Sequence, residues 1–189
     1  MTSDDSVEPI RAERQTVIFF EGLEVDGYRM PDGEFRVSLS GASLALGYAR
    51  NWLSRSMNQP RSTTVKALQG LGFSEKKEKV VAQSSQGNSI EAETISLDDF
   101  NCCIIYATQQ KKKPAIAINR AFTKLSLLDF FRDAFGETAL SIEEKRRIFY
   151  ETYAASIIPE EWRQMEREDI IKLALPGDEP HLRDGLWNQ

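Results

Sequence analysis

Hydrophobic and polar positions alternate in the first fifth of the chain, as they do in strands. The run TVIFF at residues 16–20 combines β-branched and aromatic side chains, a composition typical of strands. Phe35, Val37 and Leu39 alternate with polar residues, which predicts a strand with one buried face. The turn sequence PDG at residues 31–33 precedes it, where proline presets one turn dihedral and glycine accepts a positive one. The pattern predicts a β-hairpin around this turn.

After residue 39 the apolar spacing changes to that of short helices. We expect a first helix that Ser40 caps and Gly47 ends, because a serine hydroxyl accepts from an orphan backbone N–H and glycine tolerates the closing turn. Residues 51–57 and 63–71 predict two further short helices. This helix, break, helix order is the arrangement found in helix-turn-helix readers of DNA, although many α+β domains contain such a corner.

Residues 74–96 predict a return to extended structure before a longer helix. Residues 74–89 are polar and rich in Gln and Ser, which predicts an exposed hairpin or loop, and residues 92–96 predict a strand. Ser96 or Asp98 then opens a helix with acidic groups in its first turn, where the helix dipole favours them. Its core face recurs at helical spacing through Phe100, Cys103, Ile104 and Ala107.

The remaining third of the chain has a helical pattern. A long helix is expected from Pro114 to Gly136. Its expected buried side comprises Ala115, Ile118, Phe122, Leu125, Leu128 and Phe131. Ser141 and Glu144 form a capping box that opens the next helix, and Pro159 begins a last one.

These elements predict an α+β fold in which a small β-hairpin or sheet packs with several helices and a C-terminal helical extension follows. A chain of 189 residues is expected to form one principal domain. We expect a flexible arm over residues 1–15, an α+β DNA-binding domain over residues 16–136, and a helical extension and tail over residues 137–189 that serves interaction or dimerisation.

The composition of the chain limits the kinds of functional site that it can contain. No apolar run approaches the roughly 20 residues that span a bilayer, and the first 15 residues lack the pattern of a secretory signal, so we expect a cytoplasmic protein without a membrane partner. Cys102 and Cys103 are neighbours, which predicts buried free thiols. His181 is the only histidine, which argues against a histidine triad or a multi-histidine metal site. We expect no cofactor.

The net charge of −5 conceals a basic middle. Residues 1–40 carry a net charge of −5, residues 41–136 carry +5 and residues 137–189 carry −5. A basic middle is typical of a protein that meets an anion, although so mild a mosaic also arises by chance.

Two stretches resemble a known group of DNA-binding domains. LSGASLALGY after the hairpin, and ETISLDDF followed later by AINRAFTKLSLLDFFRDAFG, are similar to the BRO-N and KilA-N group of phage, viral and bacterial regulators. The resemblance covers about residues 17–136 and implies a compact α+β DNA-binding domain that is usually fused to a second module. The acidity of the chain departs from that group, and the C-terminal helices match none of its partner domains.

The basic middle supplies the candidate DNA-binding side chains. Arginine, lysine and small hydroxyls contact phosphates, and Asn, Gln and Arg read base edges. The candidates are Arg50, Asn51, Arg55, Arg61, Lys66, Lys76, Lys77, Lys111, Lys112, Lys113 and Arg120. Tyr48 and Trp52 have aromatic rings, and such rings stack on bases in some nucleic-acid-binding proteins. Aromatic residues at helical spacing are more often part of the hydrophobic core, and we expect a core position for Trp52. The expected partner is double-stranded DNA, and the expected role is that of a transcriptional or phage-type regulator.

Two other classes stay open. Pro31-Asp32 with Glu75 and Lys77 matches the loose pattern of a Mg²⁺-dependent nuclease, in which two carboxylates hold the metal. The acidic C-terminal helices predict a protein-interaction module or inhibitor, because they carry more apolar surface than a helical hairpin hides alone. These helices would pack on the main domain, on a second copy in a homodimer, or on a regulatory partner, and they would also be placed to mask the basic middle.

Overall fold

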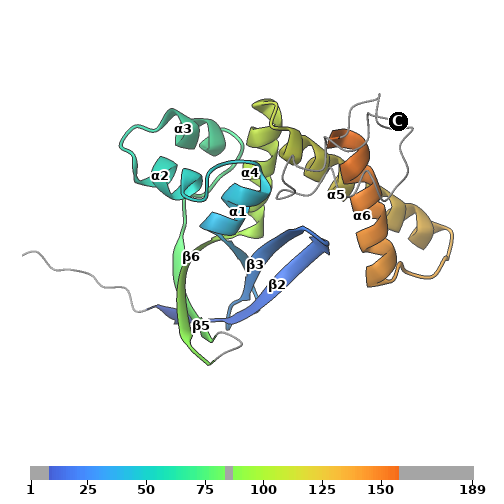
Figure 1. Cartoon of the computed structure of the whole chain (residues 1–189), viewed down its shortest axis with the longest axis horizontal. Helices are drawn as coiled ribbons and strands as arrows, with labels where there is room; N and C mark the ends of the chain where they lie inside the picture. Colours follow the sequence, from blue (N-terminus) through green and yellow to red (C-terminus); the bar gives the residue numbers. More distant parts are fainter. Residues whose placement is uncertain (1–8, 84–86, 158–189) are drawn as a thin grey trace, which may run out of the picture.

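The computed structural model of the chain describes residues 9–83 and 87–157, and in these residues it has a six-stranded mixed sheet with helices gathered at one end (Figure 1). The predicted α+β class is confirmed. The strands are β1 (Ile10–Arg11), β2 (Glu13–Phe20), β3 (Leu23–Arg29), β4 (Phe35–Ser38), β5 (Glu78–Gln83) and β6 (Ser89–Ser96). The helices are α1 (Leu39–Ala45), α2 (Trp52–Asn58), α3 (Thr63–Gln69), α4 (Leu97–Gln109), α5 (Lys113–Ala134) and α6 (Ile142–Ile157).

One N-terminal segment occupies both edges of the sheet. The strand order is β1-β5-β6-β4-β3-β2, with β1 parallel to β5 and β2 antiparallel to β3. Only Ala12 separates β1 from β2, and its N–H donates to the carbonyl of Val81 at 3.0 Å. The sheet is therefore curled, since its two outer strands are nearly continuous in the chain. Residues 10–15, which we expected in a flexible arm, are paired in the sheet, and residues 1–8 lie outside the described residues.

The predicted hairpin is confirmed in β3 and β4. Gly27 pairs with Val37 across the two strands. The N–H of Met30 donates to the carbonyl of Glu34 at 2.8 Å, and the Asp32 carboxylate accepts from the Glu34 N–H at 2.9 Å. Gly33 has a φ of 91°, a conformation that favours glycine and explains its place in the turn.

Two element boundaries differ from the sequence expectation. Ser38, and not Ser40, caps α1: its hydroxyl accepts from the Gly41 N–H at 3.0 Å, so the helix starts where β4 ends. The region 74–89 contributes β5 to a hairpin with β6, one of the two structures expected there, but β6 begins at Ser89 and not at Ala92. The apolar pair of this region lies in β5, where Val80 is fully buried because it faces the inside of the curled sheet with Tyr28 and Met30.

The main core lies between the sheet and the helices, and α6 belongs to it. Phe149 of α6 is 2% exposed, stacks on Phe19 of β2 at a centroid distance of 5.4 Å, and contacts Phe122 of α5 edge-on at 5.0 Å. The expected α4 face of Phe100, Cys103, Ile104 and Ala107 is buried there, and both cysteines are free, buried thiols as predicted. The described part of the C-terminal extension is thus joined to the main domain. The helix expected after Pro159, and His181, lie outside the described residues.

Candidate nucleic-acid interface

The turn between α1 and α2 stacks two aromatic rings. The backbone N–H groups of Gly47 and Tyr48 close the end of α1 by donating to the carbonyls of Leu44 and Ser43, both at 3.0 Å. Gly47 has a φ of 78°, as a helix ending of this Schellman type requires. The Tyr48 ring then stacks on Trp52 at 3.9 Å, and Tyr106 of α4 lies 6.1 Å from Trp52 on a nearly parallel plane. Trp52 is half-buried against the core, as expected from its sequence context.

The turn between α4 and α5 packs against this aromatic stack. The Lys112 ammonium lies 4.5 Å from the centre of the Tyr48 ring and 3.5 Å from the Gly47 carbonyl oxygen. A Cβ at position 47 would stand 3.0 Å from the Pro114 Cγ, so glycine permits the close approach of the two turns. Two basic segments about 60 residues apart in sequence therefore meet. We call residues 47–58 together with residues 110–114 the basic corner.

Lys111 occupies a strained position at the basic corner. Its N–H donates to the Thr108 carbonyl at 2.9 Å, and the Lys112 N–H donates to the Ala107 carbonyl at 3.0 Å, which is the Schellman ending of α4. The φ of Lys111 is 59°, in the left-handed region that costs a non-glycine residue about 1 kcal/mol. Glycine holds the equivalent position after α1, α3 and α5, at Gly47, Gly72 and Gly136. Lys111 therefore places a positive charge where glycine would give a more stable helix ending.

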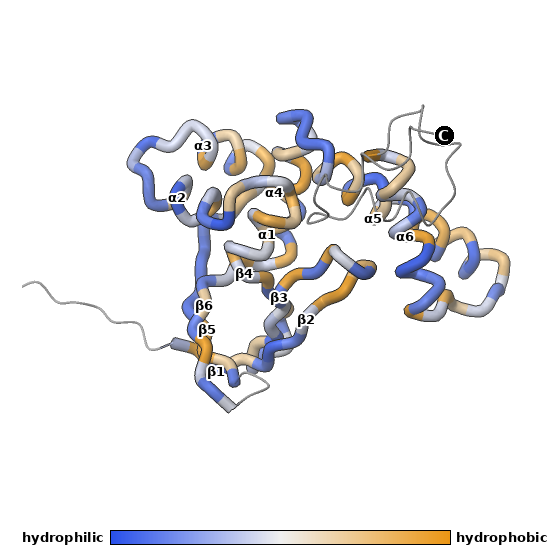
Figure 2. Tube along the Cα trace, in the orientation of Figure 1, coloured by the Kyte–Doolittle hydropathy of each residue, from blue (hydrophilic) through white to orange (hydrophobic). Residues whose placement is uncertain are grey.

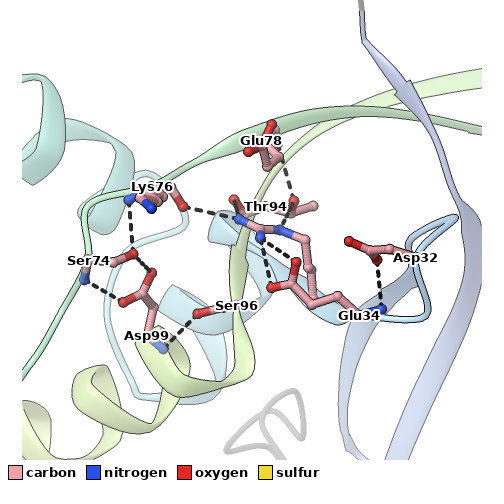
Figure 3. Close-up of polar contacts among 9 residues, drawn as sticks. Asp32, Glu34, Ser74, Lys76, Glu78, Thr94, Ser96 and Asp99 are labelled. Carbon is pink, nitrogen blue, oxygen red and sulfur yellow. Dashed lines mark hydrogen bonds and ion pairs between the residues drawn. The ribbon is translucent and has the colours of Figure 1, made fainter.

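Two buried charges position the lysines at the other end of α2. Arg36 is 6% exposed, and its guanidinium donates to the Lys76 carbonyl at 3.1 Å and to the Thr94 side chain at 3.1 Å (Figure 3). Asp99 is 1% exposed and accepts from the backbone N–H and the hydroxyl of Ser74, both at 2.7 Å. The segment that carries Lys76 and Lys77 is thus tied to the sheet and to α4.

The candidate cations differ in whether they have partners. Lys77 pairs with Glu93 at 2.8 Å and donates to the Asn58 side chain at 3.2 Å, so its charge is largely satisfied. Eight other candidates are exposed, and none of them forms an ion pair with a carboxylate in the described residues: Arg50, Arg55, Arg61, Lys66, Lys76, Lys111, Lys113 and Arg120. These side chains are therefore available to an anionic partner.

The surrounding sequence supplies no counterions. Residues 35–74 contain five basic and no acidic residues, and residues 100–128 also contain five basic and no acidic residues. The basic corner is where these two acid-free segments touch. Lys111, Lys112 and Lys113 are thereby brought together with Arg50, Asn51 and Arg55. Arg120 lies two turns further along α5, about 10 Å from Lys113. Arg61 precedes α3, and Lys66 lies in it.

Each residue of the nuclease pattern has a different structural setting. The Asp32 carboxylate closes the β3–β4 turn, and Lys77 pairs with Glu93 of β6. Glu75 lies in the segment before β5 with a φ of 60°. Within residues 9–83 and 87–157, no three His, Cys, Asp or Glu side chains are grouped so that they could hold a metal ion.

The opposite end of α5 carries exposed aromatic side chains, and the prediction for one of them, Phe131, was wrong. Phe131 was expected on the buried side, yet it is 64% exposed because α6 covers the neighbouring face of α5. It lies in an exposed apolar surface that we call the aromatic tip: Leu127, Phe130, Phe131, Phe135 and Ile142. Two ion pairs lie beside the tip, Arg132 with Glu137 at 2.9 Å and Lys145 with Asp129 at 3.3 Å, whereas Asp133 and Glu143 are exposed and form no ion pair with a described residue.

Compared with protein-family models, with curated proteins and with solved structures, the chain matches none. Among the residues that the structure describes, no helix has both the length and the apolar composition needed to cross a membrane. The α+β fold and the geometry of the basic corner are therefore the basis for a functional proposal.

Proposed function

We propose that this protein is a DNA-binding regulator that contacts double-stranded DNA through the basic corner. One observation carries the proposal: Lys112 lies against Tyr48 and Gly47, so two acid-free basic segments form one surface whose cations lack carboxylate partners among the described residues. Such cations release the counterions condensed on DNA when they contact phosphates, which favours binding.

The dimensions of the basic corner suit a duplex. An α-helix with its side chains is about 10–12 Å across and fits the roughly 12 Å width of the major groove, and α2, with seven residues, is about 10 Å long. Arg50, Asn51 and Arg55 are exposed at its start and along it, and these residue types hydrogen-bond to phosphates and base edges. The resemblance of residues 17–136 to the BRO-N and KilA-N group supports the same function.

The proposal is tested with a mixed pool of duplex DNA and the purified chain. Binding is measured from roughly 50 to 300 mM salt, with and without Mg²⁺, and the retained DNA is sequenced. We expect retention that falls steeply with salt and enrichment of one sequence motif. Cleavage of the DNA only with Mg²⁺ would favour the nuclease alternative, and no retention at 50 mM salt would contradict DNA binding and favour the protein-interaction alternative.

We also propose that a second copy of the chain docks on the aromatic tip. The five apolar residues of the tip are between 52% and 79% exposed. With aromatic side chains of about 150–250 Å² each, they expose on the order of 600 Å², near the roughly 800 Å² that each partner contributes to a standard interface. Arg132, Glu137, Lys145 and Asp129 are paired within the chain, so these four charges oppose a second copy little.

Dimerisation would serve a DNA reader because a two-fold protein contacts two half-sites. Sedimentation equilibrium of the full chain between roughly 1 and 100 μM is expected to show a monomer–dimer equilibrium. A monomer throughout this range would contradict the proposed dimer without affecting the proposal on DNA. The acidic C-terminal helices as a site for another protein stay a prediction, because much of that region lies outside the described residues.

A further inference from the structure

An apolar groove of about 660 Å³ lies away from the basic corner, on the face of the sheet that looks toward α4 and α5. Strands β2, β3 and β4 form its floor, and α4 and α5 form its wall. Most of its lining is apolar: Val17, Phe19, Val25, Phe35, Val37, Leu97, Phe100, Ile104 and Phe122. Cavities that bind small molecules have volumes of about 300–1,000 Å³ and are lined mainly by such side chains.

Strand pairing gives the groove its length. Glu13, Gln15, Val17 and Phe19 are alternate residues of β2 and line the groove from one end to the other. At about 3.3 Å per residue, they span about 20 Å. Phe19 and Phe122 close one end with an edge-on ring contact at 5.3 Å, and an ion pair between Glu13 and Arg29 stands at the other. The groove is therefore long, apolar along most of its length and polar at one end.

Gly27 lets the Val17 side chain lie flat on the floor of the groove. It lies in the middle of β3, opposite Gln15 and Val37 on the two neighbouring strands. A Cβ at position 27 would stand 2.6 Å from the Val17 Cγ2, so a larger residue there would displace the Val17 side chain. Glycine inside a strand has no side chain to pack against its neighbours, and it often marks a position where another group comes close to the backbone. Here the group that approaches is the Val17 side chain, which packs directly on the backbone of Gly27.

The charged groups that line the groove already have partners. Arg36 donates through Nε to Thr94, through one terminal nitrogen to Glu34 and through the other to the carbonyls of Lys76 and Thr94. Arg29 is paired with Glu13. A charged ligand would therefore have to displace an existing ion pair. Gln15 and Asn101 are exposed, and their amides can donate and accept hydrogen bonds at the groove.

We propose that this groove binds an uncharged, elongated and largely apolar small molecule that carries a hydrogen-bonding group at one end. The apolar floor and wall bury the body of the ligand, and burial of apolar surface contributes roughly 25 cal/mol per Å². Gln15 and Asn101 orient its polar end. This site is separate from the DNA-binding function proposed above, since no residue of the basic corner lines the groove.

The test uses Nile red, an uncharged dye whose emission shifts to the blue in apolar surroundings, and the full-length chain. We expect saturable binding with one site per chain. A neutral long-chain alcohol such as dodecanol is expected to displace the dye, whereas the dodecanoate anion is expected to compete at least tenfold less well. Equal competition by the anion would contradict the assignment of an uncharged ligand.

Two neighbouring substitutions distinguish the groove from other apolar surfaces. Val17 and Ile18 are 41% and 40% exposed and point to opposite faces of β2. Val17→Trp places an indole above Gly27 and is expected to weaken dye binding at least tenfold, whereas Ile18→Trp is expected to leave it within twofold. Equal binding by both variants, or no saturable binding by the unmodified chain, would overturn the proposal. DNA retention is expected to be unchanged in both variants, which separates this test from that of the basic corner.

Discussion

The basic corner and the aromatic tip treat charged and aromatic residues in opposite ways. At the basic corner the rings are stacked, Tyr48 on Trp52 at 3.9 Å, while Arg50, Arg55 and Lys113 are exposed and form no ion pair with a described carboxylate. At the aromatic tip four charges form two ion pairs, while Phe130 and Phe135 are 76% and 79% exposed. Figure 2 shows a hydrophilic trace from α2 into the loop before α3, and hydrophobic segments alternating with hydrophilic ones along α5.

This contrast indicates which kind of partner each surface would bind. Unpaired cations gain most from a polyanion, because the release of condensed counterions drives their binding to phosphates. Exposed aromatic rings gain most from another apolar surface, since large exposed apolar patches mark interaction sites. We therefore assign DNA to the basic corner and a second copy of the chain to the aromatic tip.

Phe149→Ala is expected to have the largest effect on stability. The basic corner and the aromatic tip belong to one folded unit, so this loss should reach both. Phe149 is buried and contacts the rings of Phe19 and Phe122, so its removal is expected to lower the free energy of unfolding by about 3–5 kcal/mol. Urea denaturation measures the loss, and hydrogen exchange is expected to show weaker protection in both α2 and α6. Unchanged protection in α2 would show that the two regions unfold separately. Glu143→Gln, on the exposed face of α6, is the control and is expected to change stability by less than about 0.5 kcal/mol.

Substitution of the aromatic tip is expected to weaken the dimer and to leave the monomer folded. Phe131→Ser with Phe135→Ser removes two exposed rings, and we expect the dimer dissociation constant to rise at least tenfold in sedimentation equilibrium. Phe35→Ser is the matched control, since Phe35 is 58% exposed but lies in the groove of the sheet. An equal effect of the control would contradict the assignment of the interface to the aromatic tip.

Lys111→Gly is expected to separate stability from DNA affinity at the basic corner. Glycine relieves the left-handed strain and is expected to raise the free energy of unfolding by up to about 1 kcal/mol, while loss of one charge lowers the salt dependence of DNA binding by about one unit. Lys113→Gly is the control. It removes the same charge from the first residue of α5 and is expected to lower stability by up to about 1 kcal/mol. Equal stability changes in the two variants would contradict the strain at Lys111.

The smallest expected effect concerns Tyr48 at alkaline pH. Burial raises the pKa of Tyr48 to about 12 from its ordinary value of 10, and Tyr106 and Cys103 add to the shift. Because the folded-state pKa is raised, the contribution of Tyr48 to stability is complete below pH 10 and is lost as the pH rises from 10 to 12. Wild-type protein is therefore expected to lose more stability than Tyr48→Phe between pH 9.5 and 11.5 in urea denaturation. Equal losses would contradict the raised pKa.

Features set by neighbouring residues were predicted well from the sequence. The PDG turn, the capping box and the α4 core face are all found, since each depends on residues only a few positions apart. In the capping box, the Ser141 N–H donates to the Glu144 carboxylate at 2.9 Å, and the Glu144 N–H donates to the Ser141 hydroxyl at 3.2 Å. The backbone N–H that Ser141 donates to the carboxylate lowers the pKa of the Glu144 carboxyl.

Features set by tertiary pairing were not predicted. Alternation in residues 10–20 gives no sign that β1 and β2 occupy opposite edges of the sheet, because β2 pairs with the next strand, β3, whereas β1 pairs with β5 far along the chain. Phe131 has helical spacing with buried residues, but α6 determines which face of α5 is covered. The sequence identified the cations of the basic corner, but only the fold brings Lys112 to Tyr48 and pairs Lys77 with Glu93.

The salt dependence of DNA affinity in two charge-matched variants tests the central claim most directly. One variant combines Arg50→Glu, Arg55→Glu and Lys113→Glu at the basic corner, and the other combines Arg11→Glu, Lys79→Glu and Lys124→Glu, which are exposed elsewhere. Each set of three reversals changes the net charge from −5 to −11. We expect the basic-corner variant to lose about three units from the slope of log affinity against log salt and at least 100-fold in affinity near 100 mM salt. The other variant is expected to stay within about one unit of the wild-type slope. Equal losses in the two variants would show that DNA responds only to net charge, and would contradict the basic corner as the binding surface.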